Sequence, residues 1–133
     1  MASIFSKIIT GEIPCHKIAE DESCFAFLDI NPNQTGHTLC VTKKEQDKFL
    51  DLSLADYQKL MFFSRKVALA IQETIPCKRV GMSIIGLEVP HVHVHLIPLN
   101  LMKDATFQSK VEATPEQLAQ TALAIAKVFQ NLP

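Results

Sequence analysis

The chain has 133 residues, of which 47% are hydrophobic and 20% are charged, and its formal net charge is −1. This length is typical of one domain, and we expect a single domain that spans residues 1–133. Lys and Arg are not clustered, which argues against nucleic-acid binding. No window approaches the roughly 18 consecutive apolar residues of a membrane span, and the N-terminus lacks a long apolar signal segment. We therefore expect a soluble, cytoplasmic protein that binds neither nucleic acid nor membrane.

Hydrophobic periodicity predicts one short helix and three strands in the first third of the chain. Apolar residues at helical spacing precede Thr10 and Gly11, which end the helix. A polar stretch separates the first two strand-like segments and suits a hairpin turn. The predicted elements are a helix over residues 4–9 and strands over residues 15–19, 24–29 and 37–42.

Capping signals predict a long helix in the middle of the chain. Ser53 is a favourable N-cap, so the helix should begin at Leu54 and end before Pro76. Phe62 and Phe63 lie outside its main apolar stripe. They indicate either self-association through this helix or a wider buried face.

The remaining elements complete an α+β fold. Two further strands are expected over residues 80–85 and 91–99, and two prolines bracket the second of them. Residues 114–117, Thr-Pro-Glu-Gln, combine an N-cap Thr, a Pro at the first helical position and a capping-box Gln. They predict a C-terminal extension, a helix over about residues 115–131. Hairpin strands favour an antiparallel sheet, because a parallel sheet needs a helix between most strands.

Three of the five histidines, His91, His93 and His95, alternate with aliphatic residues. Side chains two residues apart on a strand share one face, so the three imidazoles should form a row backed by apolar residues. Three interpretations of this row are open. It could be a solvent-facing strand, a metal site completed by other ligands, or a site of nucleophilic catalysis by a neutral imidazole.

The segment 91–97, His-Val-His-Val-His-Leu-Ile, resembles the His-φ-His-φ-His-φ-φ signature of the histidine triad (HIT) family, where φ is apolar. Residues 4–14 are similar to the opening segment of that family, and residues 25–39 to its second block. The similarity is closest to the Hint-like branch.

This resemblance implies a fold and a function. The implied fold is a five-stranded antiparallel sheet with one long central helix, a short N-terminal helix and a C-terminal helix, which dimerises into a ten-stranded sheet. The implied function is hydrolysis of nucleoside 5′-phosphoramidates or related nucleotidyl substrates of AMP or GMP type, through a covalent intermediate and without a cofactor. The alternatives are a nucleotide-binding regulatory protein with little activity and a dinucleoside polyphosphate hydrolase.

The resemblance also implies roles for individual residues. His93 would be the nucleophile, His91 would orient it, and His37 would pack behind it. His95 would bind the α-phosphate with help from the backbone near Val89. Asp29 would bind the ribose. The base would be enclosed by five apolar residues, Phe5, Ile8, Phe27, Leu28 and Ile30.

Three residues depart from the family pattern. Glu88 stands where a hydroxyl residue usually assists the leaving group, and a carboxylate about 4 Å from a phosphate repels it by roughly 1 to 4 kcal/mol. Our hypothesis is that Glu88 donates a proton to a departing amine. Ser3 and Ser6 occupy positions where some relatives carry zinc-binding cysteines. Because serine is a poor zinc ligand, we predict no structural metal.

Overall fold

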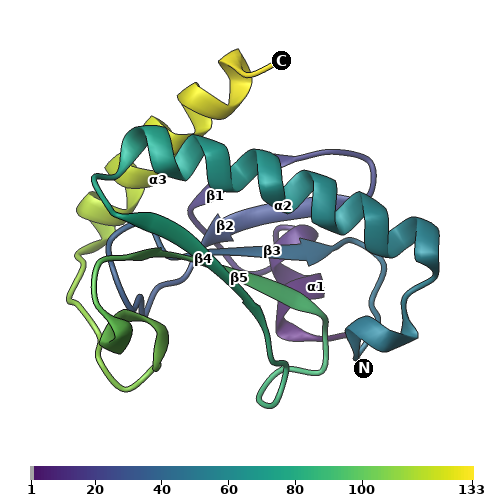
Figure 1. Ribbon diagram of the computed structural model, residues 1–133. Helices are drawn as coiled ribbons and strands as arrows, with labels where there is room; N and C mark the ends of the chain where they lie inside the picture. The colour runs from purple at the N-terminus through teal and green to yellow at the C-terminus, as the bar shows by residue number, and fades with distance from the viewer. Residues whose placement is uncertain (1) are drawn as a thin grey trace.

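A computed structural model describes residues 2–133 as an antiparallel sheet with helices on both faces (Figure 1). The sheet has five strands in the order β1-β2-β3-β5-β4, and every neighbouring pair is antiparallel. This confirms the predicted α+β fold. The strands are β1 (Lys17–Glu20), β2 (Cys24–Leu28), β3 (Thr38–Thr42), β4 (Arg79–Ile84) and β5 (His93–Leu99).

Local capping fixes where the three α-helices begin. The helices are α1 (Ile4–Ile9), α2 (Leu54–Thr74) and α3 (Pro115–Asn131), with 3₁₀ turns at Phe49–Asp51 and Met102–Ala105. The side chains of Ser3, Ser53 and Thr114 each accept a hydrogen bond from a backbone N–H of the following first turn. Gln117 completes the predicted capping box with Thr114. In residues 2–133, no helix combines the length and apolarity that a membrane crossing needs.

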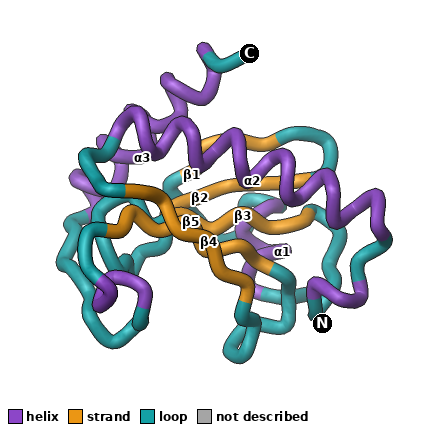
Figure 2. The backbone as a smooth tube through the Cα atoms, viewed as in Figure 1, coloured by secondary structure: helices purple, strands orange, loops and turns teal. Residues whose placement is uncertain are grey.

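The two faces of the sheet hold separate apolar cores because side chains alternate along each strand. Helices α2 and α3 pack against one face and bury the larger core (Figure 1). Helix α1 covers part of the opposite face, where Phe5, Phe25, Phe27, Leu39 and Val41 form a smaller core. The β4–β5 connection and the segment after β5 lie on this side of the sheet, away from α2 (Figure 2).

The histidine strand is shorter at its start than predicted. It begins at His93, where pairing with Val41 of β3 starts, instead of at His91. The backbone N–H of Val92 donates to the carbonyl of Gln46 in a loop, 2.7 Å away. His91 and Val92 are therefore held by loop contacts that the alternation of side chains could not reveal. At the other end Pro98 lies inside β5, beyond the last residue paired with β3, Leu96. Its missing N–H therefore costs no pairing with β3, although Pro98 still lies opposite Val80 of β4.

The second apolar side of α2 is covered by α3. Phe63 is buried and its ring meets the Phe129 ring edge to face, with 6.0 Å between centroids. Phe63 therefore widens the buried face of the helix and is not available for self-association. Phe62 remains 74% exposed.

Candidate active site

His93 and His95 are the two triad residues that lie on β5. Val94 and Leu96, between and after them, enter the larger core on the α2 side. The His93 and His95 rings meet edge to face, with 4.9 Å between centroids. Although His91 precedes the strand, its ring lies beside Phe5, and Phe5 also contacts His93 at 4.9 Å. The three imidazoles are thus neighbours, and the structure brings all of them to the α1 side of the sheet.

The hydrogen bonds of His93 leave one ring nitrogen free to react. Nδ1 lies 2.8 Å from the backbone carbonyl of His91, and a carbonyl only accepts hydrogen bonds. Nδ1 therefore carries the ring proton, and Nε2 keeps its lone pair. Burial lowers the pKa of His93 below its ordinary value, which favours the neutral ring. A neutral imidazole with an unprotonated Nε2 is a competent nucleophile.

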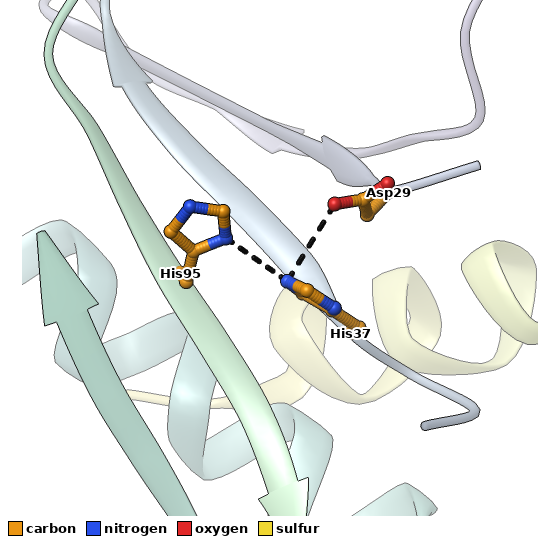
Figure 3. A group of neighbouring side chains, drawn as sticks. All are labelled: Asp29, His37 and His95. Carbon is orange, nitrogen blue, oxygen red and sulfur yellow. Dashed lines mark hydrogen bonds and ion pairs between the residues drawn. The ribbon is translucent and has the colours of Figure 1, made fainter. Parts of the chain in front are cut away.

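His95 is held as a hydrogen-bond donor by a chain of buried contacts (Figure 3). The backbone N–H of Asn33 donates to Nδ1 of His37 over 3.0 Å, so the proton of His37 is on Nε2. That N–H donates to Nδ1 of His95, also over 3.0 Å, which leaves the proton of His95 on its Nε2. Burial lowers the pKa of His37 to about 3 and that of His95 to about 4. Both rings are therefore neutral at pH 7.

His91 is anchored to α1 and β3. Its Nε2 lies 2.7 Å from the carbonyl of Thr42, so Nε2 is protonated and Nδ1 accepts from the hydroxyl of Ser3 over 2.6 Å. The Ser3 backbone N–H and the Ser6 hydroxyl both donate to the carboxylate of Glu45, at 2.7 and 2.6 Å. Ser3 and Ser6 thus connect the first turn of α1 to the triad through hydrogen bonds.

Asp29 follows the end of β2 and points toward the histidines (Figure 3). Its Oδ1 accepts the backbone N–H of Asn31 at 2.8 Å, and its Oδ2 lies 3.6 Å from Nε2 of His37. Burial raises the pKa of this carboxyl group. The second carboxylate oxygen remains available to a ligand hydroxyl.

The Asp29, His37 and His95 ligand atoms all lie within 4.8 Å of one another, a spacing that a metal ion could use. However, a metal on Nε2 of His37 would displace the proton that this nitrogen carries. That proton would have to move to Nδ1, where the N–H of Asn33 already donates. The hydrogen-bond directions therefore favour a metal-free network over the metal interpretation of the row.

A cavity of about 540 Å³ opens in front of His93 and His95. Its walls come from α1, the end of β2, β3, the β4–β5 connection and the segment after β5. The lining residues are Phe5, Asp29, Asn31, Leu39, Ile85, Gly86, Leu87, Glu88, Val89, His93, His95, Phe107 and Lys110. The expected site residues Phe5, Asp29, Glu88 and Val89 are thus brought together with the two histidines.

Other expected binding residues lie elsewhere. Phe27 and Ile8 belong to the apolar cluster that supports Phe5, behind the cavity wall. Leu28 belongs to the larger core on the opposite face of the sheet, because it alternates with Phe27 along β2. Ile30 is 74% exposed and does not line the cavity. The structure therefore does not bring Leu28 and Ile30 into this cavity.

Several lining residues are not among the predicted site residues, and two of them, Phe107 and Lys110, come after β5. The Phe107 ring meets the His95 ring with 4.7 Å between centroids. The Lys110 ammonium lies 5.1 Å from the centre of the Phe107 ring. Both belong to an irregular segment with no periodicity or motif, so no local signal pointed to them. They reach the site only because the chain folds back after β5.

The neutral His93 and His95, beside a cavity that also contains a carboxylate, form the kind of site that carries out nucleophilic substitution. Sequence comparison identifies the family, because residues 10–102 match the HIT domain, and the chain belongs to the HIT family. A HIT-like protein of Methanocaldococcus jannaschii is 40% identical over 102 residues, which cover 71% of this chain and 77% of the relative.

Two further comparisons extend this result. The adenosine 5′-monophosphoramidase of Schizosaccharomyces pombe is 38% identical over 99 residues, which cover 74% of each chain. The crystal structure of a HIT-like protein from Bartonella henselae superposes with a TM-score of 0.82 at 27% identity and covers 95% of both chains. The five-stranded arrangement is therefore the fold of the family.

Proposed function

We propose that this protein is a nucleotide-binding hydrolase that cleaves purine nucleoside 5′-phosphoramidates through a covalent intermediate on His93. The observation that carries the proposal is the free Nε2 of His93, since the His91 carbonyl holds the proton on Nδ1. Membership of the HIT family and similarity to an adenosine 5′-monophosphoramidase support the substrate class.

The reaction would proceed in two substitutions at phosphorus. In the first, Nε2 of His93 forms a bond to the α-phosphorus, and the bond between phosphorus and the amine nitrogen breaks. The amine leaves with the bonding electron pair and takes up a proton. In the second, water attacks the phosphorus, loses a proton, and releases the nucleoside monophosphate and free His93. Dividing the reaction in this way lets one cavity serve both steps.

The neighbouring groups would hold the substrate in place. The Nε2–H of His95 is directed by its bond to His37 and would donate to a phosphate oxygen. Backbone near Val89 would assist, and Asp29 would accept hydrogen bonds from the ribose hydroxyls. Phe5 and Leu39 provide the apolar wall of the cavity and would face the purine base. No cofactor takes part in this scheme.

Glu88 lies exposed on the rim of the cavity, and no hydrogen bond involves its carboxylate within residues 2–133. It is free to meet a leaving group that departs toward solvent. We propose that it takes up a proton from water and donates it to the departing amine.

We also propose that two copies of the chain pair through β4. Within the described residues β4 pairs only with β5, so its outer edge is open. Antiparallel pairing of two such edges would join two sheets into one of ten strands and remove an exposed edge. Analytical ultracentrifugation tests this, and a single species at monomer mass at micromolar concentration would contradict it.

The decisive experiment for the activity uses adenosine 5′-phosphoramidate in the presence of a metal chelator. We expect AMP release, an adenylylated peptide that contains His93 after rapid quenching, and loss of both in His93→Ala. Binding without turnover would instead support the regulatory alternative, and turnover restored only by added metal would overturn the metal-free mechanism. Cleavage of diadenosine polyphosphates in preference to the phosphoramidate would favour the dinucleoside polyphosphate alternative.

A further inference from the structure

The segment between β5 and α3, residues 100–114, forms one wall of the cavity. It lies almost wholly beyond residues 10–102, which match the HIT domain. Asp104 secures it, because its carboxylate accepts the backbone N–H groups of Asn100 and Leu101 at 2.8 and 2.9 Å. The side-chain amide of Gln34 donates to the same carboxylate at 2.8 Å. This wall is therefore a structured part of the site that the family match leaves undescribed.

Lys110 lies on this segment, and its ammonium makes fewer hydrogen bonds than it can donate. Nζ donates to the carbonyl of Asn31 over 3.1 Å and to Oδ1 of Asn33 over 2.8 Å. An ammonium has three N–H groups, so one remains for a ligand. The residue is exposed and lines the cavity, and its flexible stem lets the charge move within the cavity.

Phe107, which contacts Lys110, has an unusual backbone conformation. Among residues 2–133 it is the only non-glycine residue with a positive φ, at +62°. L-residues rarely adopt this region, and such residues often lie at functional sites. In this conformation the Phe107 ring contacts both the Lys110 ammonium, 5.1 Å from the ring centroid, and the His95 ring, with 4.7 Å between centroids. Phe107 thereby links the ammonium to His95, the histidine proposed to bind the phosphate.

The charges around the cavity explain why a cation is needed there. Asp29 and Glu88 are the acidic residues of its lining, and Lys110 is the single Lys or Arg in the described lining. His93 and His95 are buried and neutral, so neither supplies a positive charge. A phosphate entering this cavity would meet two carboxylates, and Lys110 is the lining residue that can offset them.

We propose that Lys110 is a substrate-binding residue whose ammonium contacts the phosphate of the bound nucleotide and makes the cavity selective for charged nucleotides over neutral nucleosides. This inference rests on the proposed nucleotide-binding function and assigns a phosphate contact to a residue outside the matched family domain.

The test compares AMP with adenosine, because the two ligands differ only in the phosphate. Isothermal titration calorimetry measures Kd for both with the wild type and with Lys110→Gln, which removes the charge but keeps a hydrogen-bond donor. We expect Kd for AMP to rise about tenfold, in line with the loss of one charged hydrogen bond. Kd for adenosine should stay within about twofold. Lys110→Arg should retain AMP binding, and Lys103→Gln, on the same segment outside the cavity, is the matched control.

Other outcomes refute the inference. Equal weakening of AMP and adenosine would assign Lys110 to the ribose or to folding, and unchanged AMP binding would remove it from the site. If Lys110→Gln does not fold, a salt titration of the wild type tests the inference instead. The affinity for AMP must then fall with added KCl, while the affinity for adenosine stays constant. A wild type that binds AMP no better than adenosine would also contradict the inference. A wild type that binds neither ligand would refute the proposed function itself.

Discussion

Replacing His37 by phenylalanine tests the hydrogen-bond chain that orients His95. The two side chains are similar in shape, so packing against Phe107 is largely kept, but both ring nitrogens are lost. The substitution leaves two groups without partners, the N–H of Asn33 and Nδ1 of His95. Because His37 is fully buried, water cannot replace its nitrogens.

The structure sets the size of the expected effects. Each buried group left unpaired costs about 1–3 kcal/mol, so the free energy of unfolding should fall by about 2–6 kcal/mol. His95 also loses the donor that keeps its proton on Nε2, and it can then turn an unprotonated nitrogen toward the phosphate. Loss of that one donor to a charged group, worth about 1.5–3 kcal/mol, should lower kcat/KM by about 10- to 150-fold.

Three measurements check this chain of reasoning. Urea denaturation gives the loss of stability, phosphoramidate hydrolysis gives kcat/KM, and ¹⁵N chemical shifts of the imidazoles report which nitrogen of His95 is protonated. His16→Phe, a histidine outside the site, is the matched control and should change neither activity nor the His95 spectrum. If His37→Phe keeps wild-type turnover while the His95 tautomer changes, the donor from His95 is not needed for catalysis. An unchanged tautomer of His95 would refute the assigned hydrogen-bond directions from Asn33 through His37 to His95.

Four further predictions follow from the site. The folded-state pKa values of His37 and His95, about 3 and about 4, lie below the ordinary value near 6.5, so the unfolded chain binds more protons between these limits. Stability should therefore fall as pH decreases from about 6.5 to about 4, by up to about 1.4 kcal/mol per pH unit for each residue, as measured by urea denaturation across that range. Because burial also lowers the pKa of His93, kcat/KM should remain flat below pH 6.5 before it declines, and an acid limb with a midpoint above 6.5 would contradict a neutral buried nucleophile. Glu88→Gln should slow phosphoramidate turnover about 10- to 100-fold while an activated ester that leaves without protonation reacts normally, and equal rates for the amine substrate would disprove the proton-donor role. Elemental analysis of the purified protein should find far less than one zinc per chain, and near-stoichiometric zinc would overturn the prediction made from Ser3 and Ser6.

Local signals predicted most of the fold because they act within a few residues. Ser53 and Thr114 cap α2 and α3 where the sequence places them, since a cap requires only the next turn of the same helix. The alternation of apolar residues correctly separated Val94 from its histidine neighbours, because the period of a strand is independent of its partners. The same pattern placed the start of the strand wrongly at His91. The N–H of Val92 donates instead to the loop carbonyl of Gln46, which is distant in sequence, and the strand begins at His93.

The candidate site also has features that the sequence predicts and features that only the tertiary structure determines. The sequence shows three alternating histidines, and their resemblance to a known signature indicates nucleophilic catalysis at His93. Their protonation could not be read, because it depends on acceptors and donors from other segments, such as the carbonyl of Thr42 and the N–H of Asn33. Lys110 likewise reaches the cavity only through the return of the chain after β5. Residue types and their period are local properties, whereas a proton's position and a pocket's charge arise from contacts between segments distant in sequence.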